Sequence, residues 1–236
     1  MTSLRRAAEH LVREPFVEIV NGLDAVLGTG MRSLGLVAIG LVAGWWLYVP
    51  AHELLHAFGC WIAGGEVSRL EIDPMYGAKV LALVFPFVVP GRAYAGRLSG
   101  FDTGGNDWIY LATDLAPFLL TLFPGFWWLR RSARTANAMA FGAALPLAFA
   151  PLISLTGDAY EIASLAVVHL PPWQGRRELV ADDLLANLAA LLHGGSGGLV
   201  AGALTAAFLG LFWALVWIAA AREVARRLGQ VALAPR

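Results

Sequence analysis

The sequence predicts a mostly α-helical, multi-pass membrane protein, and three observations lead to that prediction. Of the 236 residues, 58% are hydrophobic and only 14% are charged, whereas a soluble domain carries about 25% charged residues. Four apolar runs each exceed the roughly 20 residues that a helix needs to cross a bilayer. Tryptophans lie near the ends of these runs, as interfacial aromatic side chains do in membrane proteins: Trp45, Trp46, Trp127, Trp128, Trp213 and Trp217.

The expected helices can be placed in chain order. Residues 1–30 carry apolar side chains near helical spacing with charges between them. This pattern indicates an amphipathic helix that either lies at the membrane interface or packs on the bundle. About four membrane spans are expected, over residues 34–62, 108–129, 136–170 and 199–221. Pro146, Pro151 and the polar stretch TGDAYE interrupt the third span, which is therefore a candidate for a bent or split helix.

Residues 65–107, between the first two spans, differ from the rest of the chain. Within them, residues 66–89 mix alternating polarity with β-branched and aromatic residues, which indicates a β-hairpin or a small sheet. The glycine-rich residues 91–107 are expected to form a loop. Before the last span, the sequence DDLLANLAALLH (residues 182–193) predicts a short amphipathic helix.

Charge and cysteine content narrow the classes of function. The 17 basic and 17 acidic residues give a formal net charge of zero, which argues against a nucleic-acid partner. The single cysteine, Cys60, excludes an intramolecular disulfide and a four-cysteine metal site. We interpret residues 1–236 as one membrane-embedded domain of a plasma or inner membrane. Arginines gather near both ends of the chain and in RRSAR (residues 130–134), so the positive-inside rule predicts cytoplasmic termini.

Ionisable side chains inside the spans are few, and three of them form an H-E-x-x-H pattern in AHELLHAFGC, residues 51–60. On a helix, His52 and His56 share a face, so both imidazoles can reach one metal ion. Glu53 can then act as the general base toward a metal-bound water. The alternative interpretation is a hydrogen-bonded polar cluster that only joins helices.

A catalytic zinc ion takes three protein ligands, so a third ligand is needed. His10, His169 and His193 lie in the charged N-terminal segment, at the end of the third span and in a glycine-rich loop. Asp158 and Glu161 of TGDAYE are better candidates, because residues three apart share a helix face. The helical rise along the spans also places both polar segments near the same membrane face.

Asp114 lies in the second span toward that same face. It could line the site or orient a ligand histidine, or it could make a polar contact between helices. Cys60 follows His56 by four residues, and we interpret it as a small buried residue and not as a ligand.

These features resemble the site-2 protease family of intramembrane zinc metallopeptidases. The resemblance covers roughly residues 35–165 and rests on the membrane-embedded HELLH, the β-like segment after it, the stretch TDLAPFLL and the later aspartate. It implies that His52, His56 and Asp158 bind Zn²⁺ and that Glu53 activates water to cut substrate helices.

The chain also departs from that family in two respects. The family aspartate usually lies in Leu-Asp-Gly, whereas Asp158 follows Thr156-Gly157 and precedes Glu161, so either carboxylate could be the third ligand. The family holds its zinc nearer the cytoplasmic face, whereas the arginine distribution here places the site nearer the outer face.

The function expected from the sequence is hydrolysis of peptide bonds in membrane-associated or transmembrane substrates. Its partners would be the lipid bilayer and a membrane protein or peptide, and the oligomeric state is not defined by the sequence. Residues 66–89 could bind an extended substrate by strand addition or could be purely structural. Two alternatives stay open: a non-catalytic scaffold or transporter that uses the polar site, and a zinc hydrolase acting on a lipid amide.

Overall fold

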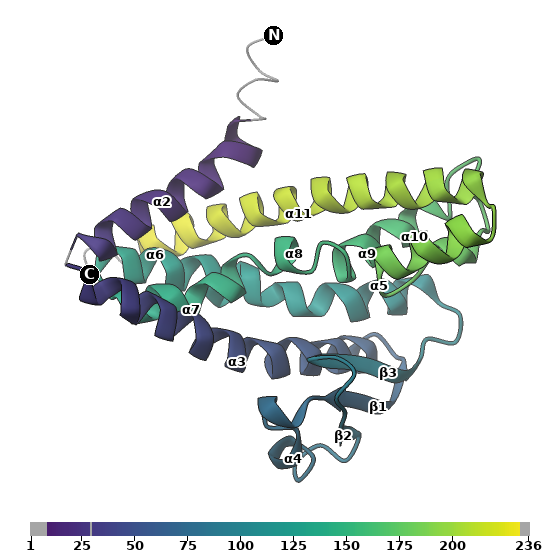
Figure 1. The fold of residues 1–236 in the computed structure, drawn as a ribbon, viewed down its shortest axis with the longest axis horizontal. Helices are drawn as coiled ribbons and strands as arrows, with labels where there is room; N and C mark the ends of the chain where they lie inside the picture. Colours follow the sequence, from purple (N-terminus) through teal and green to yellow (C-terminus); the bar gives the residue numbers. More distant parts are fainter. Residues whose placement is uncertain (1–8, 29, 232–236) are drawn as a thin grey trace.

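The structure is a computed structural model that describes residues 9–28 and 30–231, and it is an elongated helical bundle with a small sheet at one end (Figure 1). The mostly helical fold class is confirmed. The helical elements are η1 (Glu9–Arg13), α2 (Glu14–Leu27), α3 (Arg32–Ile62), η2 (Pro74–Tyr76), α4 (Ala78–Leu81), α5 (Asp107–Leu115), η3 (Ala116–Phe118), η4 (Thr121–Gly125), α6 (Phe126–Arg134), α7 (Ala138–Ala148), α8 (Ala150–Ile153), α9 (Asp158–Val167), η5 (Arg177–Leu179), α10 (Leu184–His193) and α11 (Gly197–Val231). The strands are β1 (Glu66–Ile72), β2 (Val88–Pro90) and β3 (Gly96–Asp102).

Three helices in the described part of the chain are long and apolar enough to cross a membrane. They are α3, the run Asp107–Arg134 from α5 to α6, and Gly197–Gly229 of α11. Large apolar side chains on their outer faces are exposed, including Val42 of α3 and Phe208 of α11, as expected for helices in lipid. The chain is therefore compatible with an integral membrane protein, with three such helices where the sequence predicted about four.

The predicted third span, residues 136–170, is divided among α7, α8 and α9. The longest of these, α7, has 11 residues, which make about 16 Å of helix and cannot cross the hydrocarbon core alone. Helical backbone angles are lost at Phe149 (φ −111°, ψ 16°) and at Gly157 (φ −106°, ψ −115°). The region is thus split, and the break at Gly157 makes Asp158 the first residue of α9.

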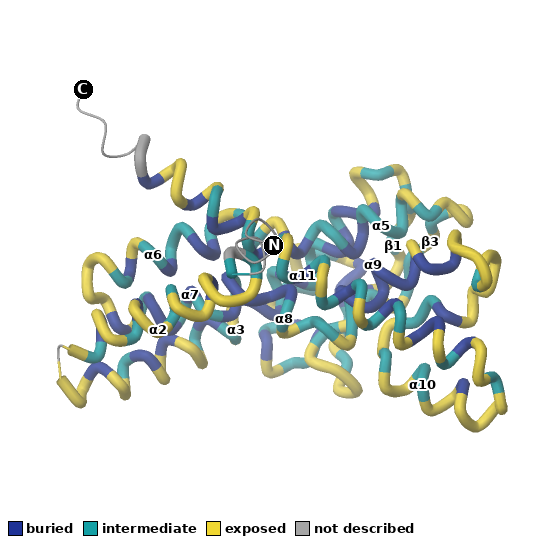
Figure 2. The backbone as a smooth tube through the Cα atoms, turned by 90° about the horizontal axis from the view of Figure 1, so that it is seen from above, coloured by how far each residue is buried: buried dark blue, intermediate teal, exposed yellow. Residues whose placement is uncertain are grey.

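Small residues bring the short helices close to the long ones. A Cβ atom on Gly40 of α3 would lie 2.0 Å from the Met139 carbonyl oxygen of α7, and one on Gly210 of α11 would lie 2.6 Å from the Ala159 carbonyl oxygen of α9. Backbones that touch in this way are typical of membrane helix packing. Seen from above, buried residues lie along the middle of the bundle and include most of α9, which packs against α11 (Figure 2). These contacts fix α9, and with it Asp158, against the bundle.

The sheet confirms part of the prediction for residues 65–107 and corrects another part. Its strand order is β2-β1-β3, with β1 parallel to β2 and antiparallel to β3. The predicted β structure in residues 66–89 is present, but residues 91–107, expected to be a loop, contain β3. Glycine here permits close strand packing, because a Cβ on Gly100 would lie 2.6 Å from Ser68 Oγ.

The N-terminal helix packs on the bundle. Of the predicted helix over residues 1–30, residues 1–8 and 29 lie outside the described residues, and α2 covers 14–27 with buried Pro15, Gly22 and Val26. Glu18 of α2 pairs with Arg130 of α6 and Arg222 of α11. The short helix predicted over residues 182–193 is confirmed as α10, capped by the Asp183 carboxylate, which accepts from the Leu185 and Ala186 N–H groups.

Candidate metal centre

His52 and His56 lie on adjacent turns of α3 with their rings turned into the protein. The two residues are only 6% and 7% exposed, and their Nε2 atoms lie 3.2 Å apart. The helix continues through Pro50 without ending, so the one-turn spacing predicted from the sequence is preserved. Two buried imidazoles in an apolar helix need partners, since unsatisfied polar groups are costly there.

Asp158 supplies the third group. Its Oδ2 lies 2.9 Å from His52 Nε2 and 3.7 Å from His56 Nε2. One ligand atom from each of the three residues lies within 4.8 Å of the others, and this is the one group with metal-ligand spacing in the described part of the chain. Of the two carboxylates left open by the sequence, the structure therefore brings Asp158 to the histidines.

Glu161, the alternative third ligand, is turned toward α5. Its Oε1 accepts a hydrogen bond from the Tyr110 hydroxyl, and the residue is buried. It remains in the same cavity as Asp158 but is outside the group that could hold one ion.

The distances and the burial of Asp158 fit a metal ion. Zinc held tetrahedrally at about 2.0–2.1 Å from nitrogen and oxygen separates its ligand atoms by roughly 3.4 Å, close to the 3.2, 2.9 and 3.7 Å found here. Asp158 Oδ2 is buried, and the polar atoms that face it are the Nε2 atoms of His52 and His56. A buried carboxylate oxygen needs a donor or a cation, and a cation between these three atoms would satisfy it.

Each histidine is also held from its other nitrogen. His56 Nδ1 lies 2.9 Å from the Thr113 carbonyl oxygen. Because a carbonyl only accepts hydrogen bonds, Nδ1 carries the proton, and Nε2 of the neutral ring is free to bind a metal. His52 Nδ1 lies 2.8 Å from the Tyr48 hydroxyl, and this contact fixes the orientation of the His52 ring. Such outer contacts fix metal-binding histidines in their functional tautomer.

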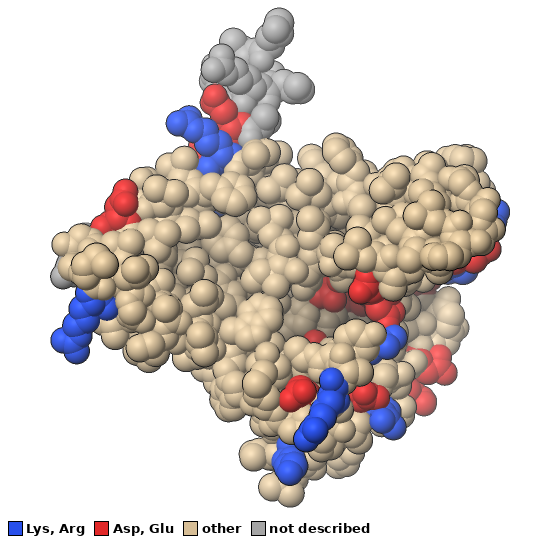
Figure 3. All heavy atoms as spheres, viewed as in Figure 1, with Lys and Arg blue, Asp and Glu red and all other residues tan. Residues whose placement is uncertain are grey.

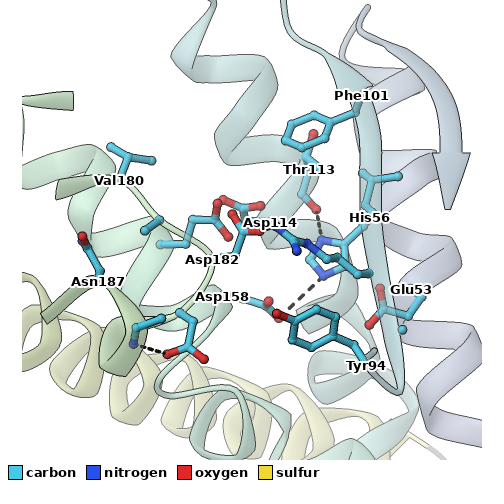
Figure 4. A pocket seen from close by; sticks show the side chains of 17 residues that line it. Glu53, His56, Tyr94, Phe101, Thr113, Asp114, Asp158, Val180, Asp182 and Asn187 are labelled. Atoms are coloured by element: carbon cyan, nitrogen blue, oxygen red, sulfur yellow. Dashed lines mark hydrogen bonds and ion pairs between the residues drawn. The ribbon is translucent and has the colours of Figure 1, made fainter. Parts of the chain in front are cut away.

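Glu53 lines the same cavity as His56 and Asp158 (Figure 4). Strand β3 packs closely against it, because a Cβ on Gly96 would lie 2.2 Å from Glu53 Cγ. A larger residue than glycine at position 96 would therefore displace the carboxylate. This places a carboxylate beside the histidine pair at a wall formed by β3.

The cavity has a volume of about 580 Å³ and lies between α3, β3, α5, α9 and α10. Asp114 lines it and is 3% exposed. Of the two roles at the site that the sequence left open for Asp114, the geometry supports lining the site, since Thr113 O and Tyr48 are the Nδ1 partners of the histidines. Cys60 is fully buried with its Sγ 3.7 Å from the Glu66 carbonyl oxygen, as expected for a small core residue.

Several residues of the site and of the cavity wall were missed by sequence reasoning. Tyr48 could have been found, because it precedes His52 by one helical turn. Gly96, Arg97 and Leu98 lie in the stretch predicted to be a loop, and the segment around Asp182 reaches the cavity only through the tertiary fold. No motif marks these positions.

Comparison of the chain with protein-family models, with curated proteins and with solved structures finds no match. No match supports the resemblance to site-2 proteases, which stays a prediction from the sequence.

Proposed function

We propose that this protein is a membrane-embedded zinc hydrolase that cleaves peptide bonds of membrane-associated or transmembrane substrates. The observation that carries the proposal is the convergence of His52 Nε2, His56 Nε2 and Asp158 Oδ2 at a cavity whose wall includes His56, Asp158 and Glu53. Two imidazoles and one carboxylate form a known ligand set of catalytic zinc, whereas calcium and magnesium prefer oxygen ligands only. The zinc assignment follows from this donor chemistry.

A zinc ion bound there supplies Lewis-acid polarisation of the scissile carbonyl and lowers the pKa of water. Glu53 accepts a proton from the attacking water and returns it to the nitrogen of the leaving amine. The Thr113 carbonyl holds His56 in the tautomer that exposes Nε2, and the Tyr48 hydroxyl orients the His52 ring. The apolar helices around the cavity restrict access of bulk water and strengthen these electrostatic interactions.

A peptide substrate is supported by the position of β3. This strand is at the edge of the sheet, with β1 on its other side, and its residues Gly96, Arg97 and Leu98 line the cavity. An exposed strand edge can pair with an extended peptide through main-chain hydrogen bonds. A peptide added to β3 would run beside Glu53. We therefore assign strand addition to β3, whereas the sequence left open whether residues 66–89 bind substrate or are purely structural.

The membrane orientation is part of the proposal. The arginines of α6 and of the end of α11 lie at one end of the bundle, and the sheet and α10 lie at the other (Figure 1). If the arginine-rich end is cytoplasmic, as the positive-inside rule predicts, both termini are cytoplasmic and the cavity lies toward the opposite face. Cysteine-accessibility labelling of sites in α10 and in α6 in intact cells would test this orientation.

The function is tested with Glu53→Gln. Protein purified in detergent is measured for zinc by mass spectrometry and incubated with a pool of fluorogenic peptides and with stripped membranes, whose new N-termini are then sequenced. The wild type is expected to carry stoichiometric zinc and to cleave peptides, and Glu53→Gln to retain zinc with at least a roughly 100-fold lower rate, as expected for loss of a general base.

Glu66→Gln is the matched control, because it makes the same change at an exposed residue of β1 and should leave the rate unchanged. A wild type without zinc would favour the transporter or scaffold alternative. If the zinc-loaded wild type leaves peptides intact but releases fatty acid from lipid amides, the protein is a lipid hydrolase and not a peptidase.

A further inference from the structure

The cavity is strongly acidic for a site surrounded by apolar helices. Its wall contains six carboxyl groups and one guanidinium, and Figure 3 shows acidic side chains gathered around the hollow between the upper helices and the sheet. The carboxyl groups belong to Glu53, Asp114, Asp158, Glu161, Asp182 and Asp183.

Most of these carboxyl groups have a partner or a role. Asp182 Oδ2 accepts a hydrogen bond of 2.6 Å from Arg97, the one basic residue of the wall. Asp183 caps α10. Glu53 and Asp158 belong to the catalytic group proposed above. Two carboxyl groups remain, on Asp114 and Glu161.

Asp114 lacks a partner within the described part of the chain. The residue is only 3% exposed, and it lines the cavity. Its Oδ2 has no hydrogen-bond donor among the described residues. Figure 4 shows Asp114 beside the site, on the same side as Asp182. Glu161 is close by, with one oxygen engaged by Tyr110. A buried carboxylate with no donor costs several kcal/mol unless a cation or a hydrogen-bond donor reaches it.

An organic cation suits this pair better than a second metal ion. Neither Asp114 nor Glu161 belongs to a group of three or more side chains with metal-ligand spacing among residues 9–28 and 30–231. An ammonium or a guanidinium group is larger, presents several N–H donors in fixed directions, and can bridge two carboxylates that are farther apart.

We infer that Asp114 and Glu161 form a subsite for a positively charged side chain of the substrate, lysine or arginine, next to the bond that is cut. This inference rests on the proposed peptidase function and names the substrate class. The cation would be held away from the ligand group, so that substrate charge and metal do not compete for Asp158. A neutral substrate residue would leave the buried carboxylates unpaired, so the site discriminates strongly against substrates with a neutral residue at this position.

The test uses internally quenched decapeptides that carry lysine, arginine, norleucine or glutamate at each position in turn, with the zinc-loaded enzyme in detergent. At one position, lysine or arginine is expected to raise kcat/KM about 10-fold to 100-fold over norleucine. Asp114→Asn and Glu161→Gln should each reduce that ratio about tenfold while cleavage of the norleucine peptide continues. Asp24→Asn, the same change at an exposed residue of α2, should leave the ratio unchanged.

Binding to the inactive Glu53→Gln protein separates this inference from the function. Fluorescence anisotropy with the labelled lysine and norleucine peptides should show tighter binding of the lysine peptide, lost when Asp114→Asn is added. If peptides are cleaved without preference for a basic residue, or if Asp114→Asn and Glu161→Gln both leave the preference intact, the subsite is wrong and the peptidase stands. If no peptide is cleaved but the lysine preference in binding depends on Asp114, the subsite stands and the peptidase is wrong. Equal or absent binding of both peptides, together with absent cleavage, overturns the subsite.

Discussion

The two ends of the bundle each contain a partly buried cluster of charged residues, and the clusters differ in how the charges are matched. At the end formed by α2 and α6, Glu18 accepts hydrogen bonds from the guanidinium groups of Arg130 and Arg222, and Arg222 also contacts Glu14. At the opposite end, the cavity collects six carboxyl groups and a single arginine that is already paired with Asp182.

This difference indicates what each cluster does. A carboxylate surrounded by guanidinium groups is satisfied within the fold, and it joins the helices that supply the charges. A buried carboxylate oxygen without a partner in the fold needs a cation or a hydrogen-bond donor from outside it. The first cluster is therefore expected to control stability, and the second to control metal binding and catalysis. Substitutions in one cluster should have little effect on the property that the other controls.

The largest effect short of removing a ligand is expected for Gly96→Ala. A Cβ at this position would lie 2.2 Å from Glu53 Cγ, so the Glu53 side chain must move, and a displacement of about 1 Å can cost about 100-fold in rate. Zinc content and thermal stability should stay near the wild-type values. Peptidase kinetics and zinc analysis check this, with Gly35→Ala as the control, because a Cβ at Gly35 meets no atom within 4 Å. Unchanged kinetics in Gly96→Ala would contradict the claim that β3 positions the Glu53 carboxylate.

The next effect concerns the contact between Tyr48 and His52, with the Tyr48 hydroxyl 2.8 Å from His52 Nδ1. Tyr48→Phe removes it and should weaken zinc binding by about 10-fold to 100-fold, as is typical for outer contacts of metal-binding histidines. Competition with a chromogenic chelator measures this change. Tyr76→Phe removes another hydroxyl of the same core, one bonded to Trp45, and should leave zinc affinity unchanged. Equal losses in both variants would mean that packing, not orientation of His52, sets the affinity.

The smallest effect on activity, and the clearest on stability, is expected for Glu18→Gln. Burial raises the pKa of Glu18, but the hydrogen bonds and charges of Arg130 and Arg222 outweigh it and hold the pKa below its usual 4.5. The substitution should cost about 2–3 kcal/mol, less than the roughly 3–5 kcal/mol of a fully buried pair, because these side chains retain some exposure. Zinc content and kcat should be unchanged.

The pH dependence of this effect has a definite sign. A carboxyl group with a lowered pKa in the folded state stabilises the protein above its unfolded pKa and loses that contribution as the pH falls. The difference in thermal midpoint between wild type and Glu18→Gln should therefore be largest above pH 4.5 and shrink below it. Glu223→Gln, at an exposed residue of α11 with two arginine partners, should shift the midpoint far less. If Glu223→Gln lowers the thermal midpoint and Glu18→Gln does not, the Glu18 cluster does not control stability as this comparison predicts.

The sequence predicted the ligand-bearing half of the site well, because the chemistry is local there. The spacing of His52 and His56 on one helix determines their geometry, and the cost of polar residues in an apolar span singles out Asp158 and Glu161. The choice between those two could not be made from sequence, because it depends on where Gly157 breaks the helix and on the partner that Tyr110 offers to Glu161.

The part of the cavity formed by β3 and by the backbone of α5 could not be predicted, and the reasons are physical. Strand β3 was not predicted because its glycines favour a loop unless a neighbouring strand packs against them. That pairing with a neighbouring strand is a non-local contact, which the local sequence does not reveal. Thr113 acts through its backbone carbonyl, for which the residue type gives no signal. The fourth predicted span is not confirmed, because hydropathy measures apolar length, whereas the breaks at Phe149 and Gly157 are properties of the backbone.

The central claim, that His52, His56 and Asp158 hold a zinc ion while the neighbouring Glu161 does not, is tested most directly by the zinc content of two matched variants. Asp158→Asn and Glu161→Gln each replace a buried carboxylate by an amide on the same helix, three residues apart. Purified in parallel with the wild type, Glu161→Gln should retain stoichiometric zinc, and Asp158→Asn should retain less than about a tenth of it, since one of three protein ligands is lost. Zinc retained in Asp158→Asn and lost from Glu161→Gln, or a wild type that purifies without zinc, would contradict the account.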